Sequence, residues 1–534
     1  MPVSVSYPGL YIEEVPSSSH AITAAPTSIT AFVGYTHPFR GECAERGEWG
    51  RAIRIFNFTD YERIFGGLYR STFIDSNVAY AVNQFFLNGG SDAYVVGLQP
   101  QYYDSQVPPT ISPQPISPAS ASTSGITFTA RQLTDVTRMT ITIGNVRPSP
   151  ANDTADILIT FGSQVESYRG VKIAGADPAT ITDSNFIEKR LALSRLVQVA
   201  PQDQVLGRYP GSFTSGAIEL SALTVPATLA GGWTTFSPQD FHDVFETDSS
   251  LDKVDIFNLL VVPGIADAGI WSTALGFCEH KRAFFIIDPP PNLTADGAGR
   301  DLPKIADAVL NGTVPTAVPN GAFYFPYLKT IDPITNEVIA LPPSGFVAGI
   351  CARIDTNRGV WKAPAGLETS ILNTTGVVDE GRMTDMRQGT LNPLGVNVLR
   401  SFPGSGTVVW GARTTVTANP AFEQWRYVPV RRTALFIEQT LLRNLGWVVF
   451  EPNDEPLWSA IRISIENFML SLFRQAAFQG ASPSQAFRVK CDASTTLQSD
   501  IDLGIVNILV GFRPLKPAEF VIIKISQIAG QVQA

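Results

Sequence analysis

The sequence is poor in charge relative to its apolar content. Only 16% of its 534 residues are charged, while 44% are hydrophobic and 10% aromatic. So little charged surface is typical of a folded protein that is covered by partners. The net charge of −9 argues against a protein that wraps nucleic acid, because that affinity comes from neutralising phosphates. We therefore expect self-assembly and no direct nucleic-acid partner.

Histidine and cysteine are also scarce, with four of each. The cysteines stand far apart, without the close spacing of a zinc ribbon or a redox dithiol, and are interpreted as buried thiols. Cys278 and His280 lie two residues apart on a predicted helix, which directs them to different faces and argues against a shared ligand site or a dyad. No metal site is expected. The residues concerned are Cys43, Cys278, Cys351, Cys491, His20, His37, His242 and His280.

No apolar run is long enough to span a bilayer. The longest, near FNLLVVPGIA, is far shorter than the ~18 to 20 residues that spanning requires. The N-terminal stretch MPVSVSYPGL has neither a basic region nor a long apolar segment, so no secretory signal is expected. We expect no membrane insertion, and synthesis and folding in the cytoplasm.

The glycine clusters lack the partners that phosphate binding needs. SFPGSGTVVWGARTT contains a GSG turn, but no Gly-Lys-Ser/Thr follows it, and GGWTT and ADGAGRD do not stand between a strand and a helix. Asp288, Asp332 and Asp355 each lie at a strand end beside Pro or Thr, where turn hydrogen bonding explains them. No nucleophile elbow and no His-Glu-x-x-His sequence occur. The sequence therefore predicts no catalytic residues, no cofactor and no enzyme.

The patterns that are present predict several kinds of folded region. A strand at AFVGYT and a helix in SNVAYAVNQFFLNGG precede a Pro/Ser/Gln-rich stretch, residues 99–126, which predicts an extended connector. Period-two runs between 127 and about 235 predict a small all-β module. From about 236 onward, alternating strands and helices predict α/β layering. The stretch that follows, up to about residue 400, is rich in glycine and predicts few strands.

Two amphipathic helices are predicted in the last third of the chain. One covers TALFIEQTLLRNLG and ends at Gly446. The other follows NDEPLW, with Asp454 as its N-cap and Pro456 in its first turn. Apolar residues recur along the second helix at helical spacing and predict a core face. They are Trp458, Ile461, Ile465, Phe468 and Leu472.

Both ends of the chain read as strands without local partners. PAEFVIIKIS, residues 517–526, is rich in β-branched residues but follows prolines that interrupt a ladder. At the other end, PVSVSYPGLYIEEV alternates Val3, Val5 and Tyr7, breaks at Pro8-Gly9 and continues through Tyr11 and Ile12. We expect these strands to pair outside their own neighbourhood.

The motifs of the chain resemble those of contractile tail sheath proteins. The resemblance begins at YPGLYIEEVPSSSHAITAAPTSITAFVG and continues through YERIFGG and AVNQFFLNGGSDAYVVGL. It resumes with IIDPPP, AFYFPYLKTIDP and LPPSGFVAGICARIDTNRGVWKAPA. Near the end, RYVPVRRTALFIEQTL, WVVFEPNDEPLW, FRQAAFQGASPSQAFRVKCD and FRPLKPAEFVIIKI follow in the order typical of that family. The similarity covers residues 1–98 and about 250–528 but not the predicted β module.

The resemblance implies an α/β and α+β multidomain fold with an α/β sheath core, terminal β-strand arms and an inserted all-β domain. The predicted divisions are an N-terminal arm (1–25), the first part of the core (26–98), a linker (99–126), the inserted outer domain (127–235), an α/β domain (236–360), an inner C-terminal domain (361–513) and a C-terminal arm (514–534).

The resemblance also implies function. Sheath subunits stack as hexameric rings around an inner tube and contract to drive it through a target envelope, so the implied partners are further copies of the chain, the tube, a baseplate and a terminator or cap. The particle would be a phage tail or an injection particle that is released or anchored to a cell. Strand exchange between subunits is assigned to Val3, Val5, Tyr7, Tyr11, Ile12, Phe520, Val521, Ile522 and Ile523, hinges to Pro8, Gly9, Pro514 and Pro517, and tube-facing positions to Arg431, Arg432, Arg443, Arg462 and Arg474.

Three alternatives stay open at this point. Both terminal strands could fold back onto the sheet of their own chain. The chain could form a static shell or surface lattice that exchanges strands without contracting. Each of the arginines could equally be an ordinary solvated or intramolecular residue.

Overall fold

A computed structural model describes residues 20–105, 111–148, 153–173, 183–201, 213–221, 225, 229, 232–290, 317–378 and 383–523. The chain divides into two compact units. The sheet unit comprises residues 27–357 and 364–426. The C-terminal unit comprises residues 1–26, 358–363 and 427–534. The mixed α/β class expected from the sequence is confirmed.

An eight-stranded sheet organises the sheet unit, with the strand order β2-β3-β1-β14-β15-β16-β20-β21. The six central strands pair in parallel, and the edge strands β2 and β21 are antiparallel to their neighbours. Five of the central strands, β3, β1, β14, β15 and β16, are almost entirely apolar and buried, as a parallel sheet covered on both faces requires. The strands are β1 (Thr30–Tyr35), β2 (Ala52–Ile55), β3 (Ala93–Leu98), β14 (Leu259–Val261), β15 (Phe284–Ile287), β16 (Gly321–Phe325), β20 (Val396–Phe402) and β21 (Gly406–Val409).

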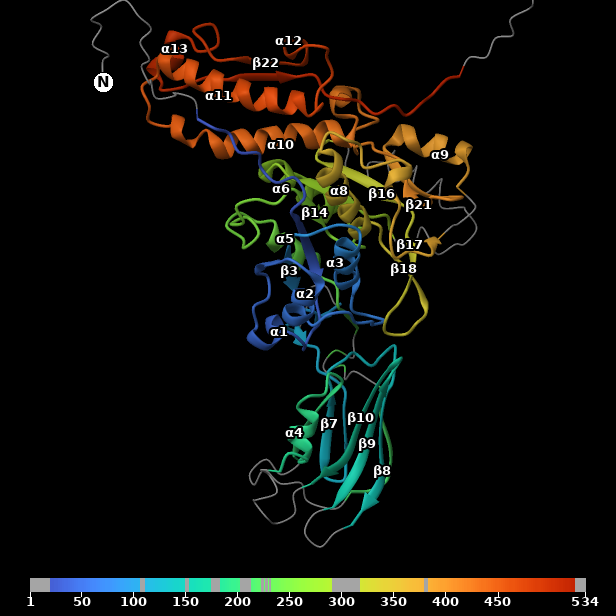
Figure 1. The fold of residues 1–534 in the computed structure, drawn as a ribbon. Helices are drawn as coiled ribbons and strands as arrows, with labels where there is room; N and C mark the ends of the chain where they lie inside the picture. The colour runs from blue at the N-terminus through green and yellow to red at the C-terminus, as the bar shows by residue number, and fades with distance from the viewer. Residues whose placement is uncertain are drawn as a thin grey trace, which may run out of the picture. The chain divides into compact units, whose positions relative to one another are not determined.

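This sheet joins segments that are far apart in the sequence, as Figure 1 shows. Thr30 of β1 lies opposite Leu259 of β14, so residues before and after the predicted β module share one sheet. Among its described residues, the helices of this unit are α1 (Glu42–Arg46), α2 (Phe58–Phe65), α3 (Asn77–Leu87), α4 (Ile187–Leu191), α5 (Pro238–Val244), α6 (Ala268–Lys281), α8 (Ser344–Arg358) and α9 (Asp385–Leu391).

The glycine-rich stretch before residue 400 was expected to carry few strands, which is wrong, because four strands (Leu328–Ile331, Val338–Leu341, Gly376–Val377 and Val396–Phe402) lie in it or begin there. The stretch also contains helix α8. Gly345 and Gly349 lie on this helix. A Cβ atom at Gly345 would lie 2.5 Å from the backbone oxygen of Ala81, and a Cβ atom at Gly349 would lie 2.6 Å from the backbone oxygen of Phe85. Both oxygens belong to α3. The two glycines therefore allow close packing of two helix backbones, and this segment is helical despite their low propensity.

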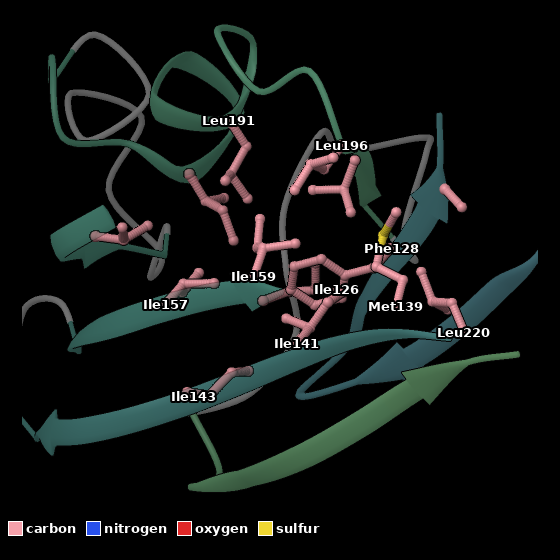
Figure 2. Close-up of a cluster of buried hydrophobic side chains, with 14 of the residues drawn as sticks. Ile126, Phe128, Met139, Ile141, Ile143, Ile157, Ile159, Leu191, Leu196 and Leu220 are labelled. Carbon is pink, nitrogen blue, oxygen red and sulfur yellow. The ribbon is translucent and has the colours of Figure 1, made fainter. Parts of the chain in front are cut away.

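The strands described between residues 120 and 220 form two sheets of their own around a separate apolar cluster, drawn in Figure 2, while β5 pairs outside this region. Ile141, Ile157 and Ile159 are 1% exposed or less, and neighbouring residues on the same strands face outward. The period-two alternation predicted for this region is therefore observed. The strands here are β5 (Gln114–Pro115), β6 (Ser120–Thr123), β7 (Ile126–Ala130), β8 (Met139–Arg147), β9 (Thr154–Phe161), β10 (Gln164–Lys172), β11 (Val197–Pro201) and β12 (Gly216–Leu220).

The described part of the predicted connector, residues 99–126, carries short strands. β4 (Gln101–Asp104) pairs with β5 and with β13 (Trp233–Thr234), and β6 pairs with β7. Extended backbone of this composition can thus be recruited into sheet edges. A further three-stranded sheet contains β17 (Leu328–Ile331), β18 (Val338–Leu341) and β19 (Gly376–Val377).

Two long helices dominate the C-terminal unit. α10 (Val428–Asn444) starts earlier than predicted, because Pro429 is compatible with a first turn. α11 (Glu455–Arg474) has the predicted N-cap: the Asp454 carboxylate accepts the N–H of Leu457 at 3.2 Å. The predicted core face of α11 is buried. The remaining elements of this unit are α12 (Pro483–Ala486), β22 (Phe487–Lys490), α13 (Gln498–Asp502) and β23 (Leu509–Phe512).

Short 3-10 helices complete the secondary structure. They are η4 (Leu367–Thr369), η5 (Asn392–Leu394), η6 (Pro420–Trp425) and η7 (Gly446–Val448). Among the described residues, no helix combines the length and the apolar character that crossing a bilayer requires.

Candidate assembly surface

The carboxyl ends of β1 and β14 mark the place where an open α/β sheet usually binds a ligand, because the strand order reverses there. Protein side chains fill this place. The hydroxyl of Tyr69, a buried residue, donates to the backbone oxygens of Tyr35 at 3.2 Å and Asp75 at 2.5 Å. The Tyr69 hydroxyl thereby connects the end of β1 to the segment that precedes α3.

Asp288, one of the carboxylates singled out in the sequence, follows β15 at the same edge. It is 1% exposed and accepts hydrogen bonds from the N–H groups of Gly264 (3.0 Å) and Ser344 (2.8 Å) and from the Ser344 hydroxyl (2.5 Å). Burial raises its pKa to about 7, opposed by these hydrogen bonds. Asp288 thus serves the start of α8, which is a structural role.

The other candidate groups do not assemble into a reactive site within the described residues. All four cysteines are buried thiols without a disulfide, as predicted. Cys278 has a raised pKa because it is buried, so its thiolate is disfavoured. Asp332 accepts the Tyr80 hydroxyl at 2.8 Å and the Ile334 N–H at 3.0 Å, as a turn residue does. In that part of the chain, no group of three or more His, Cys, Asp or Glu side chains could hold a metal.

The C-terminal segment is attached to its own unit as far as Pro514. The N–H of Arg513 donates to Ala486 at 2.8 Å, the N–H of Gln479 donates to Arg513 at 3.0 Å, and Pro514 forms a single antiparallel bridge with Phe478. Beyond this point the described chain forms no helix or strand up to residue 523. The Tyr427 hydroxyl reaches Glu519 at 3.5 Å.

Four consecutive apolar side chains then face solvent. Phe520, Val521, Ile522 and Ile523 are 75%, 81%, 82% and 79% exposed. Burying one such side chain contributes about 1.5–3 kcal/mol, so this run forgoes a large stabilisation in the isolated chain. It is the predicted strand-exchange segment, and within the described residues of its own chain it has no strand partner.

The described start of the chain is attached to the same unit by side chains of α10 and α11. The N–H groups of His20, Thr23 and Ala25 donate to Ser464, Asn444 and Thr440 at 3.0, 2.9 and 3.1 Å. The His20 ring also stacks on Trp447 with centroids 4.0 Å apart. The sequence analysis did not identify these anchors, although small polar residues on a largely apolar helix face are a usable signal. The predicted N-terminal strand residues and Pro8-Gly9 lie outside the described residues.

A two-stranded sheet in this unit has two edges that no other described strand occupies. β22 and β23 pair antiparallel, from Phe487 opposite Phe512 to Lys490 opposite Leu509. An isolated pair of strands is marginal by itself and leaves backbone groups at both edges. This pair packs on the helices through Val489, which belongs to the apolar cluster of the unit.

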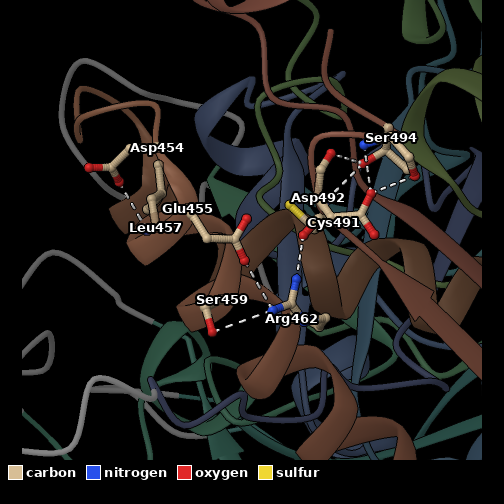
Figure 3. A network of polar contacts seen from close by, with 9 residues as sticks. Asp454, Glu455, Leu457, Ser459, Arg462, Cys491, Asp492 and Ser494 are labelled. Atoms are coloured by element: carbon tan, nitrogen blue, oxygen red, sulfur yellow. Dashed lines mark hydrogen bonds and ion pairs between the residues drawn. The ribbon is translucent and has the colours of Figure 1, made fainter.

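Arg462 connects α11 to the loop after β22, as Figure 3 shows. Its guanidinium donates to the Cys491 backbone oxygen at 2.6 Å and lies 3.4 Å from Glu455 and 3.5 Å from Ser459. The neighbouring Asp492 carboxylate accepts hydrogen bonds from Ser494, which lower its pKa. The strand pair is thereby fixed to a long helix.

The arginines predicted to face a tube differ in exposure. Arg431 and Arg432 are only 9% and 3% exposed, and Arg431 lies 3.4 Å from Glu438. Arg443 and Arg474 are exposed, and Arg462 is half-buried. Burial therefore favours Arg443 and Arg474 over the other candidates.

Comparison with known proteins identifies the class that this arrangement belongs to. "Phage tail sheath protein central domain" matches residues 249–415, and "Phage tail sheath C-terminal domain" matches residues 421–528. The two matches include most of the strands of the large sheet and nearly all described elements of the C-terminal unit. The chain belongs to the phage tail sheath family, whose members are structural proteins and not enzymes.

Curated relatives carry the same description. The chain is 26% identical over 216 residues to the tail sheath protein of Vibrio phage KVP40, a match covering 40% of this chain and 30% of the relative. It is 31% identical over 164 residues to the tail sheath protein of Burkholderia phage BcepMu, covering 29% of this chain and 33% of the relative. The chain thus spans about a third of the length of these relatives.

The fold agrees over nearly the whole chain. The helical sheath of the anti-feeding prophage in its contracted state aligns over 98% of this chain and 100% of the other, with a TM-score of 0.54 and 22% identity. A likeness at this identity establishes a shared fold.

Proposed function

We propose that the chain is the subunit of a contractile sheath, which stacks as hexameric rings around an inner tube and contracts to drive the tube through a target envelope. Its relatives and structural neighbours are sheath proteins of phage tails and extracellular contractile injection systems. The particle is accordingly a phage tail or an injection particle, assembled in a bacterial cell. Further partners are the baseplate and a terminator or cap, with no direct nucleic-acid contact.

The exposed run from Phe520 to Ile523 is the observation that carries this proposal. A neighbouring subunit buries these side chains when the segment adds to its sheet, because strand addition satisfies backbone groups and covers alternate side chains together. The unoccupied edges of β22 and β23 supply suitable acceptors. Each backbone hydrogen bond contributes only ~1 kcal/mol, but several per arm, repeated around every ring, link the assembly.

The proposed strand exchange also assigns the hinges. Pro514 is the last residue bridged to its own unit, and Pro517 lies in the segment that follows without secondary structure. Backbone rotation near these residues would let subunits turn while their strands stay paired. Pro8 and Gly9 take the corresponding role at the N-terminal arm, and exposed Arg443 and Arg474 are the preferred tube-facing candidates.

Proline substitution in the arm tests the proposal. Val521→Pro with Ile523→Pro removes two backbone donors from a segment that is exposed in the isolated chain. We expect a folded, soluble subunit that no longer forms tubes, measured by electron microscopy and sedimentation of the purified chain with and without its tube protein.

A matched variant distinguishes the contribution of the backbone hydrogen bonds from that of the apolar side chains. Val521→Thr with Ile523→Thr keeps the N–H groups and the β-branched shape, so tubes should still form, at a higher protein concentration. Tubes from the proline variant that match the wild type in number and diameter would refute strand exchange by this arm.

A static shell or lattice that exchanges strands without contracting is the alternative. It predicts tubes or sheets of one geometry only. Electron microscopy of particles assembled on the tube protein, before and after a mild denaturing pulse, distinguishes the two: a contractile sheath changes length and diameter, and a static lattice does not.

A further inference from the structure

The outer strand β21 of the eight-stranded sheet has its free edge covered by a segment of the same chain. The backbone oxygen of Thr407 accepts the N–H of Ile371 at 2.8 Å. The backbone oxygen of Val409 accepts the N–H of Gly366 at 2.9 Å, and the Val409 N–H donates to the Thr369 hydroxyl at 3.1 Å. These backbone groups are therefore already occupied and cannot pair with a strand from another chain.

The opposite outer strand, β2, is closed by side chains. The Ala52 N–H donates to the Ser250 hydroxyl at 2.9 Å. The N–H of Phe56, directly after the strand, donates to the Asp60 carboxylate at 3.2 Å. Alternate residues of an edge strand turn their backbone groups outward, so Arg54 between these two also faces the free edge. The Arg54 side chain is 44% exposed, and a charged side chain at an edge discourages pairing with another strand.

The β22–β23 pair lacks this protection. The Arg513 N–H donates to the Ala486 backbone oxygen at 2.8 Å in the same ladder, which fixes the residues whose backbone groups turn outward. They are Phe487, Val489, Val510 and Phe512. Among the residues that the structure describes, none of these outward backbone groups makes a hydrogen bond. The two sheets therefore differ in whether their edges can accept a strand.

We propose that Ser250 and Asp60 are specificity-determining residues of strand exchange, which keep the arm of a neighbouring subunit off β2 by occupying its outward N–H groups. Both outer strands of the large sheet have β-branched residues, AIRI in β2 and GTVV in β21, and free edges of such strands attract other strands. With both edges occupied, the arm is left with the β22–β23 pair. Because it concerns where the arm binds, this proposal rests on the proposed function.

The test locates the arm on the subunit by hydrogen–deuterium exchange and mass spectrometry. The full-length chain carries Val521→Pro and Ile523→Pro, so that its own arm does not compete, and the probe is a synthetic peptide of residues 514–526. At a peptide concentration about ten times its Kd, exchange of the amides that it pairs with should slow by roughly tenfold. We expect this in β22 or β23, and no change in residues 50–57.

Opening the edge should create a second binding site. Adding Ser250→Ala and Asp60→Ala frees the N–H groups of Ala52 and Phe56, so the peptide should then also slow exchange in residues 50–57 by roughly tenfold. Thr356→Val is the control, because the Thr356 hydroxyl donates within α8, to Ala352 at 2.9 Å. It should show the parent pattern. Each single variant frees one N–H and replaces the double variant if that does not fold.

A second measurement does not involve the arm. Sedimentation velocity of the opened chain without peptide should show dimers at concentrations where the parent chain is monomeric, because two free edges can pair with each other. The control variant should remain monomeric.

Two results would overturn the proposal. One is slowed exchange of residues 50–57 in the parent chain, since β2 would then accept the peptide with Ser250 and Asp60 in place. The other is a folded, opened chain in which the peptide slows exchange in β22 or β23 but not in β2. Failure of the proposed function gives a different result, in which the peptide slows exchange in neither β22 nor β23 of any chain, and arm specificity is then refuted with it.

Discussion

The sheet unit buries most of its large apolar side chains, whereas the C-terminal unit leaves many of its own exposed. In the sheet unit, the large strands and the cluster around Ile159 enclose their apolar side chains. More than half of the exposed large hydrophobic side chains that the structure describes lie in the C-terminal unit, although it is much the smaller of the two. Under the proposed function, neighbouring chains would cover this apolar surface of the C-terminal unit, whereas the sheet unit encloses most of its own.

The largest effect that would sharpen this contrast is expected from Asp288 in the sheet unit. Its pKa is raised from 3.8 to about 7 by burial, so the folded chain retains a proton that the unfolded chain has lost. Its contribution to stability is therefore greatest below pH 3.8 and falls as the pH rises to about 7, by roughly 4 kcal/mol at ~1.4 kcal/mol per pKa unit. Denaturant unfolding across this pH range should show the fall in the wild type and its loss in Asp288→Asn.

Asp385→Asn provides the control for that measurement, because the Asp385 carboxylate is 95% exposed in the same unit. This variant leaves Asp288 and its hydrogen-bond donors in place, so the fall in stability that Asp288 causes should still be observed. An Asp288→Asn chain with the wild-type pH dependence would show that this carboxyl group is not the source.

A smaller effect is expected from neighbouring residues of β9. Ile159 is fully buried and Leu158, beside it, is 40% exposed. Ile159→Ala should lower the free energy of unfolding by about 3 kcal/mol, because it leaves a cavity, whereas Leu158→Ala should cost under ~1 kcal/mol. Urea unfolding measures both, and tube formation should persist wherever the chain stays folded. Equal costs would mean that this cluster does not carry the stability of the region.

The smallest effect concerns the C-terminal unit and its N-cap, Asp454. Asp454→Ala removes the acceptor for the Leu457 N–H and should cost about 1 kcal/mol. Asp454→Asn retains an acceptor oxygen and should cost little. Thermal unfolding compares the two variants, and an equal loss in both would assign the effect to charge near the helix start instead of to the cap.

Local patterns in the sequence predicted the local structure well. The apolar spacing along α11 and its cap at Asp454 depend on residues within one or two turns, and both are observed. The alternation of apolar and polar residues along β7, β8 and β9 likewise indicates which face of each strand is buried. Such features are encoded by neighbours in the sequence.

Features that depend on distant partners were less accessible. The role of Gly345 and Gly349 could not be predicted, because nothing near them in the sequence indicates that α3 comes within contact distance. Arg431 and Arg432 on α10 were predicted to face a tube but are buried. Their burial could not be predicted for the same reason, because it depends on distant residues. The proposed partner of the C-terminal arm is another chain, so the local sequence around the arm could not identify it.

The attachment of both chain ends to one unit has a mechanical consequence. The N–H of His20 donates to Ser464, and Pro514 forms a bridge with Phe478. A force on either terminal arm would therefore act on α10, α11 and the β22–β23 pair. In the proposed assembly, neighbouring subunits that hold the arms would transmit tension from subunit to subunit through the C-terminal unit.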